Sequence, residues 1–302
     1  MRSKRIMRGA WHHVYSITKD GGVLFYRISD RLCFYTIVSV CARRFNMIVL
    51  GLCLMFTHFH MMLRAVDLAH LRAFFGTVLS IFTRVVNADR RRSGALFKRP
   101  FGRAMRVSDK EKRSSIIYLL NNPVEKHLVT RAVEDRWTFL AHCGEAYPFT
   151  PKLVKRNVSF RLRCACDYVD GECAAGRYLI PSALRRLFKP LTRAEQEQLC
   201  DYIIDKYSFI AYNEVTELFD GERNLMLAAK ASAGKEFDVG EAFDPSSDIP
   251  YREMAALATR NGLFEDWKLL HLEKTERDKL QRLFLHATSA NEVQVRKFFH
   301  CL

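Results

Sequence analysis

Two histidines separated by one residue, His58 and His60, are the side chains of this chain best suited to chemistry. They lie near the end of an apolar run, Met47 to Met62, that contains no charged residue. Alternate side chains of a β-strand point to the same face, so a strand here would present both imidazoles together. Two such imidazoles can bind a divalent metal ion. The alternative is a pair of half-buried histidines bonded to the backbone, because this motif alone is weakly specific.

A second pair, Tyr118 and Asn122, is spaced i and i+4. On a helix these two side chains share a face. A tyrosine beside a metal site suggests cleavage of a phosphodiester, with the phenol oxygen as nucleophile. The alternative is that Tyr118 only packs, as most helical tyrosines do.

Positive charge is concentrated in the first half of the chain. Residues 1–150 contain 25 Lys and Arg against 10 Asp and Glu, whereas residues 151–302 contain 23 of each. The densest stretch, 90–113, also carries Phe97 and Phe101, which suits phosphate neutralisation and base stacking on a single strand. A solvated basic loop is the alternative. The candidate DNA-binding residues are Arg90, Arg91, Arg92, Lys98, Arg99, Arg103 and Arg106.

The surrounding sequence predicts the elements that would position these side chains. Ser108 with Glu111 forms a capping box that opens a helix, and Pro123 should end it. The order of elements indicates an α+β fold, with an antiparallel sheet and helices on one face. The expected elements are a strand over 11–17, a helix from 29 or 30 to about 44, one or two buried strands over 47–63, a helix from 67 to about 87, a basic loop, and a helix from 108 to about 122.

The second half of the chain is predicted to be mostly helical. Thr192 with Glu195 and Ser289 with Glu292 repeat the capping-box pattern. Residues 234–250 are rich in Gly, Ser, Asp and Pro, which is typical of a loop or linker.

The last predicted helix, Ser289 to Phe299, could be the recognition helix of a helix-turn-helix, with Gln294, Arg296 and Lys297 exposed. The alternative is a solvated amphipathic helix. The zero net charge of the second half argues against strong nonspecific DNA affinity.

Composition also bears on location. Nine cysteines without a paired spacing, many within apolar stretches, favour a reduced, cytosolic setting. Phe45 to Leu63 approaches the length of a membrane-spanning helix, but histidines lie at one end. Its uninterrupted apolar part, Met47 to Phe56, is about half the length that spanning requires. We therefore expect no stable membrane association, with a one-span membrane protein as the less favoured alternative.

Four segments within residues 11–145 occur in an order and spacing found in one known family. They are His13-Val14 followed by Gly22, Phe25 and Asp30-Arg31; Leu54-Met55-Phe56-Thr57-His58-Phe59-His60; Gly94-Ala95-Leu96-Phe97-Lys98-Arg99; and Tyr118-Leu119-Leu120-Asn121-Asn122-Pro123-Val124. The last three resemble the Met-Pro-Asn-His-x-His, Gly-x-Leu-Trp-Gln/Lys-Arg and Tyr-Ile-x-x-Asn-Pro-Val blocks of the single-tyrosine HUH transposases. The resemblance is to the REP-associated tyrosine transposases in particular.

This resemblance implies an α+β fold whose core is a ferredoxin-like HUH endonuclease domain. The catalytic domain would cover residues 1–145 and be followed by a linker region over 146–190. A mostly helical C-terminal domain, with DNA binding as one role, would cover 191–302.

The resemblance also implies a metal-dependent endonuclease and strand transferase that acts on single-stranded or hairpin DNA. Tyr118 would attack phosphorus and leave a 5′-phosphotyrosine link with a free 3′-hydroxyl. His58, His60 and Asn122 would hold Mg²⁺ or Mn²⁺. The implied location is the bacterial cytoplasm, at the nucleoid. Related enzymes act as monomers or dimers, so a homodimer stays open.

The chain departs from the family pattern at Phe56 and Thr57, which stand where Pro-Asn is usual. That pair shapes the entry to the strand, and a diverged copy with weakened activity is one interpretation. A non-catalytic nucleic-acid-binding protein of the same fold is a second interpretation. A third is a hydrolase that uses His58, His60 and an activated water.

Overall fold

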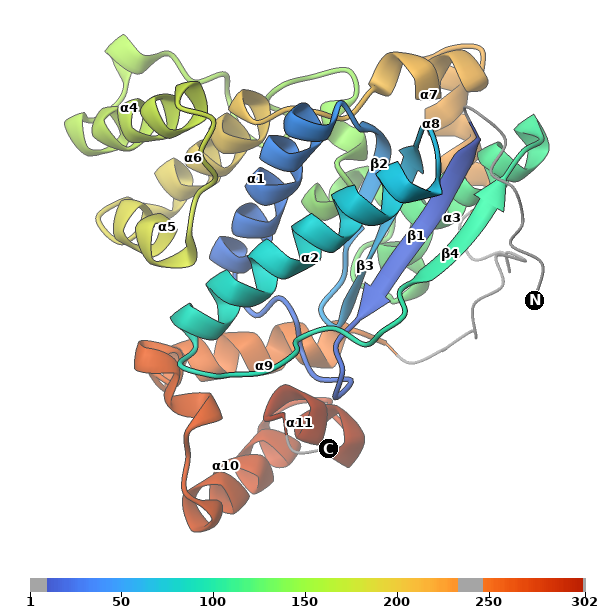
Figure 1. Ribbon diagram of the computed structural model, residues 1–302. Coiled ribbons are helices and arrows are strands. Elements are labelled where there is room, and N and C mark those ends of the chain that lie inside the picture. The colour runs from blue at the N-terminus through green and yellow to red at the C-terminus, as the bar shows by residue number, and fades with distance from the viewer. Residues whose placement is uncertain (1–9, 233–246, 301–302) are drawn as a thin grey trace.

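The computed structural model describes residues 10–232 and 247–300 (Figure 1). The strands and α-helices in chain order are β1 (Trp11–Ile17), α1 (Ile28–Phe45), β2 (Ile48–Leu54), β3 (His58–Arg64), α2 (Leu68–Asp89), β4 (Gly102–Arg106), α3 (Asp109–Glu125), α4 (Phe160–Ala174), α5 (Pro181–Phe188), α6 (Arg193–Lys206), α7 (Tyr212–Leu218), α8 (Glu222–Ala231), α9 (Ile249–Arg260), α10 (Lys274–Ala287) and α11 (Glu292–Phe298). Short 3₁₀ helices lie at η1 (Ala132–Glu134), η2 (Arg136–Thr138), η3 (Leu140–His142), η4 (Lys155–Asn157) and η5 (Glu265–Leu270).

One four-stranded sheet, in the order β2-β3-β1-β4, forms the centre of the first half. Each neighbouring pair of strands is antiparallel. The predicted α+β class is confirmed, and the alternation of strands and helices with this strand order is ferredoxin-like. The predicted strand over 11–17 is confirmed, and the apolar region 47–63 forms two strands joined by a turn at Met55–Thr57.

The two faces of the sheet carry different helices. α1 and α2 cover one face, and Figure 1 shows them in front of the strands. The prediction of helices on one face only is wrong, because α3 lies on the other face. α3 packs against the other face, where Met62 of β3 joins Ile116 and Leu119 in a second apolar cluster. Because side chains alternate along a strand, Phe59 points to the α1–α2 face, while its neighbours His58 and His60 belong to the α3 face.

Helix α2 begins where the sequence predicts, since the Asp67 carboxylate caps it by accepting from the His70 backbone N–H at 2.7 Å. α1 begins earlier than predicted. Its cap residue is Arg27, and the Asp30 carboxylate accepts from the Arg27 backbone N–H at 3.1 Å. Among the described residues, α2 alone is long and apolar enough to cross a membrane, and its buried side chains pack on the sheet and α1. A core helix of a globular protein passes the same test.

The capping box of Ser108 and Glu111 opens α3 as predicted. The predicted end at Pro123 is wrong, because the helix continues to Glu125. The proline lies in the last turn, where its missing N–H removes one backbone bond and leaves the rest of the helix intact.

Strand β4 lies inside the stretch predicted to be a basic loop. Its sequence, Gly102 to Arg106, has no run of β-branched residues, and none of its side chains is fully buried. It pairs on one side only, with β1, so it is an edge strand, and basic side chains are common on such edges because they discourage further pairing.

The second half packs on three different parts of the first. α4, α5 and α6 share the apolar cluster of α1 and α2, so the predicted linker region 146–190 contains two α-helices joined to the main core. α7 and α8 pack on α3. The last three helices cover Val23, Tyr26 and Phe56, at the end of the sheet shown at the bottom of Figure 1.

Two predictions about the C-terminal region are corrected. The capping box of α11 is formed by Asn291 and Gln294, not by Ser289 and Glu292. Gln294, predicted to be exposed, is buried, and its amide donates to the Ser247 carbonyl at 2.9 Å. Most of the predicted loop 234–250 lies outside the described residues, and residues 249–250 begin α9.

Candidate active site

The central strand β3 holds His58 and His60 on the face covered by α3. Their ring centroids are 4.9 Å apart, with the rings nearly perpendicular. His60 is fully buried between β1 and β2, opposite Tyr15 on one side and Cys53 on the other. A central strand paired on both sides fixes these side chains more rigidly than a loop could.

Helix α3 places Tyr118 beside the imidazole of His60. The centroid of the Tyr118 ring is 5.5 Å from that of His60, in an edge-on arrangement. The phenol is half-buried, whereas its helix neighbours Ile117 and Leu119 are buried. The structure thus brings together three side chains that are up to 60 residues apart in the chain.

A third imidazole, His13 of β1, belongs to the same group. Its Nε2 lies 3.1 Å from Nδ1 of His60, within hydrogen-bond distance, and the two rings are stacked. The His13 ring is also 5.8 Å from the Tyr118 ring. We did not predict His13 as a site residue. The alternation of strand 11–17 puts His13 and Tyr15 on one face, but only the pairing of β1 with β3 brings that face to His60.

Tyr15 completes the aromatic wall beside His60, with ring centroids 6.0 Å apart. Its ring lies over Gly102 of the edge strand. A Cβ atom at Gly102 would be 2.0 Å from the Tyr15 ring, so only glycine leaves room for the ring in this position.

Both histidines of β3 are oriented through the same ring nitrogen. Nδ1 of His60 faces His13, and Nδ1 of His58 lies 3.0 Å from the Thr57 hydroxyl. Metal-binding histidines are commonly oriented by a hydrogen bond at one ring nitrogen while the other binds the ion. The donor set therefore fits a metal bound through the two Nε2 atoms. Thr57, one of the departures from the family pattern, supplies one of these orienting contacts.

Burial lowers the pKa of two of these imidazoles, His60 and His13, and so favours their neutral form. It lowers the pKa of His60 well below 6.5, and the neighbouring His58 and His13 lower it further. Burial, and secondarily Arg106, lower the pKa of His13 to about 4. Neutral imidazole is the form that binds metal ions. Within the described ranges, no group of three or more His, Cys, Asp or Glu side chains is arranged to hold a metal. The candidate set is thus two imidazoles and an amide.

Asn122, the predicted third ligand, lies one turn after Tyr118 on α3 and is nearly buried. Its amide nitrogen donates to the Tyr118 carbonyl at 3.0 Å. This bond directs the Asn122 side chain back along its own helix, with the amide nitrogen as the donor. The amide oxygen is the atom that a metal ion would require.

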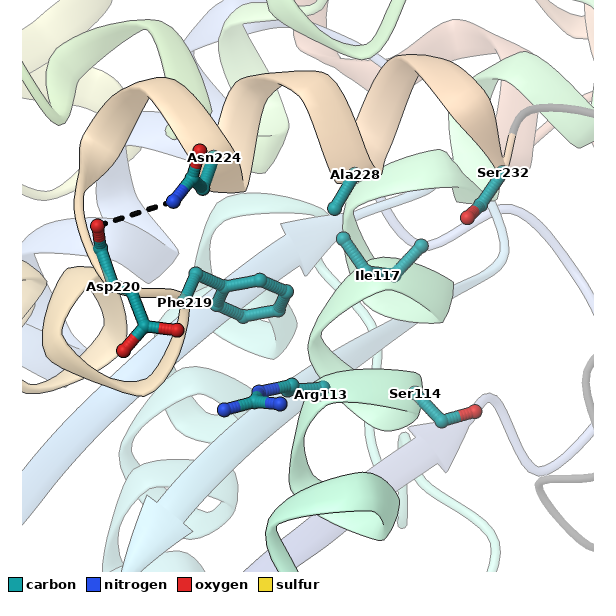
Figure 2. Close-up of a pocket in the computed structure, with 8 residues that line it drawn as sticks. All are labelled: Arg113, Ser114, Ile117, Phe219, Asp220, Asn224, Ala228 and Ser232. Atoms are coloured by element: carbon teal, nitrogen blue, oxygen red, sulfur yellow. Dashed lines mark hydrogen bonds between the residues drawn. The ribbon is translucent and has the colours of Figure 1, made fainter.

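Helix α3 is held in place from its other side by the second half of the chain. Figure 2 shows Ile117 of α3 facing Ala228 of α8, with Phe219 between the two helices, at a pocket of about 430 Å³. The Asn121 amide donates to the Ala229 carbonyl at 2.9 Å. Asn121 therefore ties α3 to α8 and fixes the helix that carries Tyr118.

The structure argues against a DNA contact for Arg90. Its side chain is 1% exposed and forms an ion pair with Asp30 at 3.3 Å. It also donates to the Leu24 carbonyl and stacks on Trp267. Arg90 therefore contributes to the core. Sequence alone did not separate it from the other basic residues, because its partner is 60 residues away.

The remaining predicted DNA-binding residues differ in exposure. Lys98, Arg99 and Arg91 are exposed, and Arg91 forms an exposed ion pair with Asp266. Arg92, Arg103 and Arg106 are half-buried. Lys98 lies beside the end of β1, at the same end of the sheet as His58. Its backbone N–H donates to the Ile17 carbonyl, and Ile17 pairs with His58.

Arg106 is the basic residue nearest to the candidate site. It pairs with Trp11 at the far end of β1, two residues from His13 on the same face, and its charge contributes to the lowered pKa of His13. Arg103 points to the other face of the sheet. There, burial and secondarily the charge of Arg103 lower the pKa of His12 to about 4. β4 thus divides its basic side chains between the two faces of the sheet.

Comparisons with known proteins add one similarity. No protein-family model and no curated protein matches the chain. A solved structure, described as a REP-associated tyrosine transposase bound to a REP hairpin, resembles it with a TM-score of 0.38 and 14% sequence identity. The match covers 45% of this chain and 79% of the other. This likeness concerns the fold, and no residue role follows from it.

Proposed function

We propose that the protein cuts and rejoins single-stranded DNA through a covalent link to Tyr118, with a divalent metal ion at His58 and His60. One observation carries the proposal. The Tyr118 ring lies 5.5 Å from that of His60, which in turn lies 4.9 Å from that of His58, on a buried central strand. This arrangement puts the phenol close to a pair of imidazoles of the kind that binds divalent metal ions.

The proposed step is an in-line displacement at phosphorus. A bond forms between the Tyr118 phenol oxygen and phosphorus, and the bond from phosphorus to the 3′ oxygen breaks. The proton that leaves the phenol balances the one that the 3′ oxygen gains. The products are a 5′-phosphotyrosine and a free 3′-hydroxyl, and the new ester keeps the energy needed for rejoining.

A free phenol has a pKa near 10, so Tyr118 needs help to act at neutral pH. Mg²⁺ or Mn²⁺, when bound, would polarise a phosphate oxygen and offset the developing charge. His58 and His60 would hold the ion through Nε2, with the Asn122 amide oxygen as a third ligand. Thr57 and His13 would keep the imidazoles in the binding orientation.

The DNA strand would lie along the basic edge of the sheet. Lys98 and Arg99 are exposed in the segment that precedes β4, and Arg106 lies near the site. Phosphate neutralisation there would position the strand without reading its sequence. We propose hairpin-forming single strands as substrates, as the sequence resemblance implies, and a location at the bacterial nucleoid.

The proposal is tested with a labelled single-stranded hairpin oligonucleotide, the full chain and Mn²⁺. We expect a covalent adduct that survives SDS and migrates at the size of protein plus DNA. Tyr118→Phe should abolish the adduct and retain DNA binding. Tyr178→Phe serves as a matched control, because this residue lies in the second half and packs against the main core away from the sheet.

The competing functions give different results. Binding without an adduct in the unaltered protein would contradict catalysis and support a non-catalytic DNA-binding protein. Cleavage that continues in Tyr118→Phe would contradict the covalent route and support a hydrolase that uses an activated water.

A further inference from the structure

A cavity of about 900 Å³ lies away from Tyr118, where the start of α1 meets η2, α6 and α9. Its walls carry six arginines: Arg27, Arg31, Arg136, Arg185, Arg193 and Arg252. The acidic residues of the wall are Glu134, Asp135 and Glu197, so cations exceed anions. A second cavity of about 1060 Å³ adjoins it and shares Arg27 and Arg185.

Arg31 is the unusual member of this set. Its residue is 7% exposed, and its guanidinium lies over the rings of Phe56, at 4.6 Å, and Trp137, at 5.4 Å. The Nε atom has no hydrogen-bond partner among the described residues. Burying a guanidinium donor without such a partner is costly, and an anion bound in the cavity would satisfy it.

Most other arginines of the cavity are already paired. Arg136 forms ion pairs with Glu197 and Asp201, and Arg185 forms two bonds with Asp89. Their charges are largely offset within the protein. Arg31 forms no ion pair with a described residue. The charges of Asp135, Asp30 and Asp248 partly offset its own, and its Nε atom remains as a donor that a ligand anion could use.

Further donors surround the same space. The Ser29 hydroxyl, 7% exposed as a residue, has no hydrogen-bond partner in the described part of the chain, and neither has Nη2 of Arg136. Ser29 and Ile28 lie in the first turn of α1 and line the cavity. The N-terminus of this 18-residue helix adds a partial positive charge. These groups together favour an anion with several oxygens, such as phosphate.

The cavity also offers flat apolar surfaces. Trp137, Phe149 and Phe188 line it, and its volume is in the range of pockets for small organic ligands. Arginines and aromatic rings in one pocket suit a ligand that combines a phosphate with a planar base. We propose that this cavity binds a nucleotide, either as a free mononucleotide or as one unit of a single strand, with its phosphate on Arg31 and Ser29.

Binding is measured by titration calorimetry at near-physiological salt with the full chain and three probes: AMP, inorganic phosphate and an eight-residue oligothymidylate. We expect saturable binding of AMP, of the oligonucleotide, or of both. AMP binding identifies a free nucleotide as the ligand, and binding of the oligonucleotide alone identifies a strand unit. Equal affinity for AMP and inorganic phosphate would overturn the nucleotide assignment, and no binding of either nucleotide probe would overturn the site.

Arg31→Met tests the residue that carries the inference. We expect binding of the nucleotide probe to weaken at least 10-fold, and the probe should raise the melting temperature of this variant less than that of the unaltered protein. A purely structural arginine would leave both the binding and this shift of melting temperature unchanged in the folded variant. Arg84→Met, an exposed arginine of α2, removes the same charge outside the cavity and should leave binding unchanged.

A second variant keeps the test valid if Arg31→Met does not fold. Arg193 lies at the exposed rim of the cavity, so Arg193→Ala should fold normally. We expect it to weaken nucleotide binding several-fold. If Arg31→Met does not fold, unchanged binding in Arg193→Ala would by itself overturn the proposal.

Discussion

The two polar regions of this molecule are built in opposite ways. The candidate active site collects neutral rings on the sheet, where His13 and His60 contact each other and His58 contacts Thr57. The arginine cavity collects charged side chains from helices and loops, and Arg31 has a buried donor atom that no described residue satisfies.

This difference indicates what each region can bind. Neutral imidazoles offer electron pairs and suit a cation, whereas spare guanidinium donors suit an anion. The comparison also shows that the binding capacity of a buried arginine depends more on whether it already has an ion-pair partner than on its charge alone. Arg90 and Arg31 are both buried arginines near the start of α1. Among the described residues, Arg90 forms an ion pair with Asp30, whereas Arg31 is near carboxylates without forming an ion pair.

The largest effect that would separate the two regions is expected from His60→Gln. Loss of one proposed metal ligand should lower the rate of adduct formation by more than about 100-fold. The hairpin adduct assay measures this rate, and Arg84→Met, which changes an exposed arginine outside both regions, should leave it unchanged. Equal losses in the two variants would show that the effect does not come from the proposed metal site.

The contrast between paired and unpaired arginines is sharpened by Asp30→Asn. This change leaves the Arg90 guanidinium buried without its carboxylate, and we expect it to lower the free energy of unfolding by roughly 3–5 kcal/mol. Urea unfolding measures the loss. A loss similar to that of Arg31→Met would contradict the assignment of Arg90 to the core.

Acidification should act on the histidine-rich sheet. The pKa values of His12 and His13 are lowered to about 4 by burial, against 6.5 in the unfolded chain. The unfolded chain therefore binds protons first, and stability should be full above pH 6.5 and fall progressively between pH 6.5 and about 4. Each histidine contributes a loss of roughly 2 kcal/mol at pH 5.

Urea midpoints at pH 7.5 and pH 5 measure this loss. The double variant His12→Gln, His13→Gln should show a smaller change between the two pH values. An equal change in the double variant would contradict the assignment of the loss to these imidazoles.

The smallest effect concerns the residue that orients His58. Thr57→Val removes the hydroxyl from His58 Nδ1, and we expect Mn²⁺ to bind about 10- to 100-fold more weakly. Titration calorimetry with Mn²⁺ measures the affinity. Thr216→Val, which removes a hydroxyl bonded to a backbone carbonyl on α7, is the control. Unchanged Mn²⁺ affinity in Thr57→Val would show that the hydroxyl does not orient a metal ligand.

The fold of the first half could be predicted closely because its signals are local. A loosely alternating segment predicted β1, and the apolar run Met47 to Met62 predicted one or two buried strands where β2 and β3 lie. Asp67 and Ser108 marked the starts of α2 and α3. β4 was missed because an edge strand made of Gly, Ala, Met and Arg has no apolar alternation.

The departure at Phe56 also needed the tertiary structure for its explanation. Its ring packs under the C-terminal helices against Tyr251 and lies beside the Arg31 guanidinium. A proline could supply neither contact. Phe56 therefore belongs to the packing of the second half and to the cavity wall, which the sequence around it does not reveal.

The sequence by itself determined that His58 and His60 share one face, because the two-residue period of a strand is a property of the backbone. It likewise determined the shared face of Tyr118 and Asn122. Only the tertiary structure decided that α3 covers the histidine face, that His13 joins His60, and that Arg90 forms an ion pair whereas Arg31 forms none with a described residue. These depend on contacts between segments far apart in the chain, which chain folding creates and local spacing does not encode.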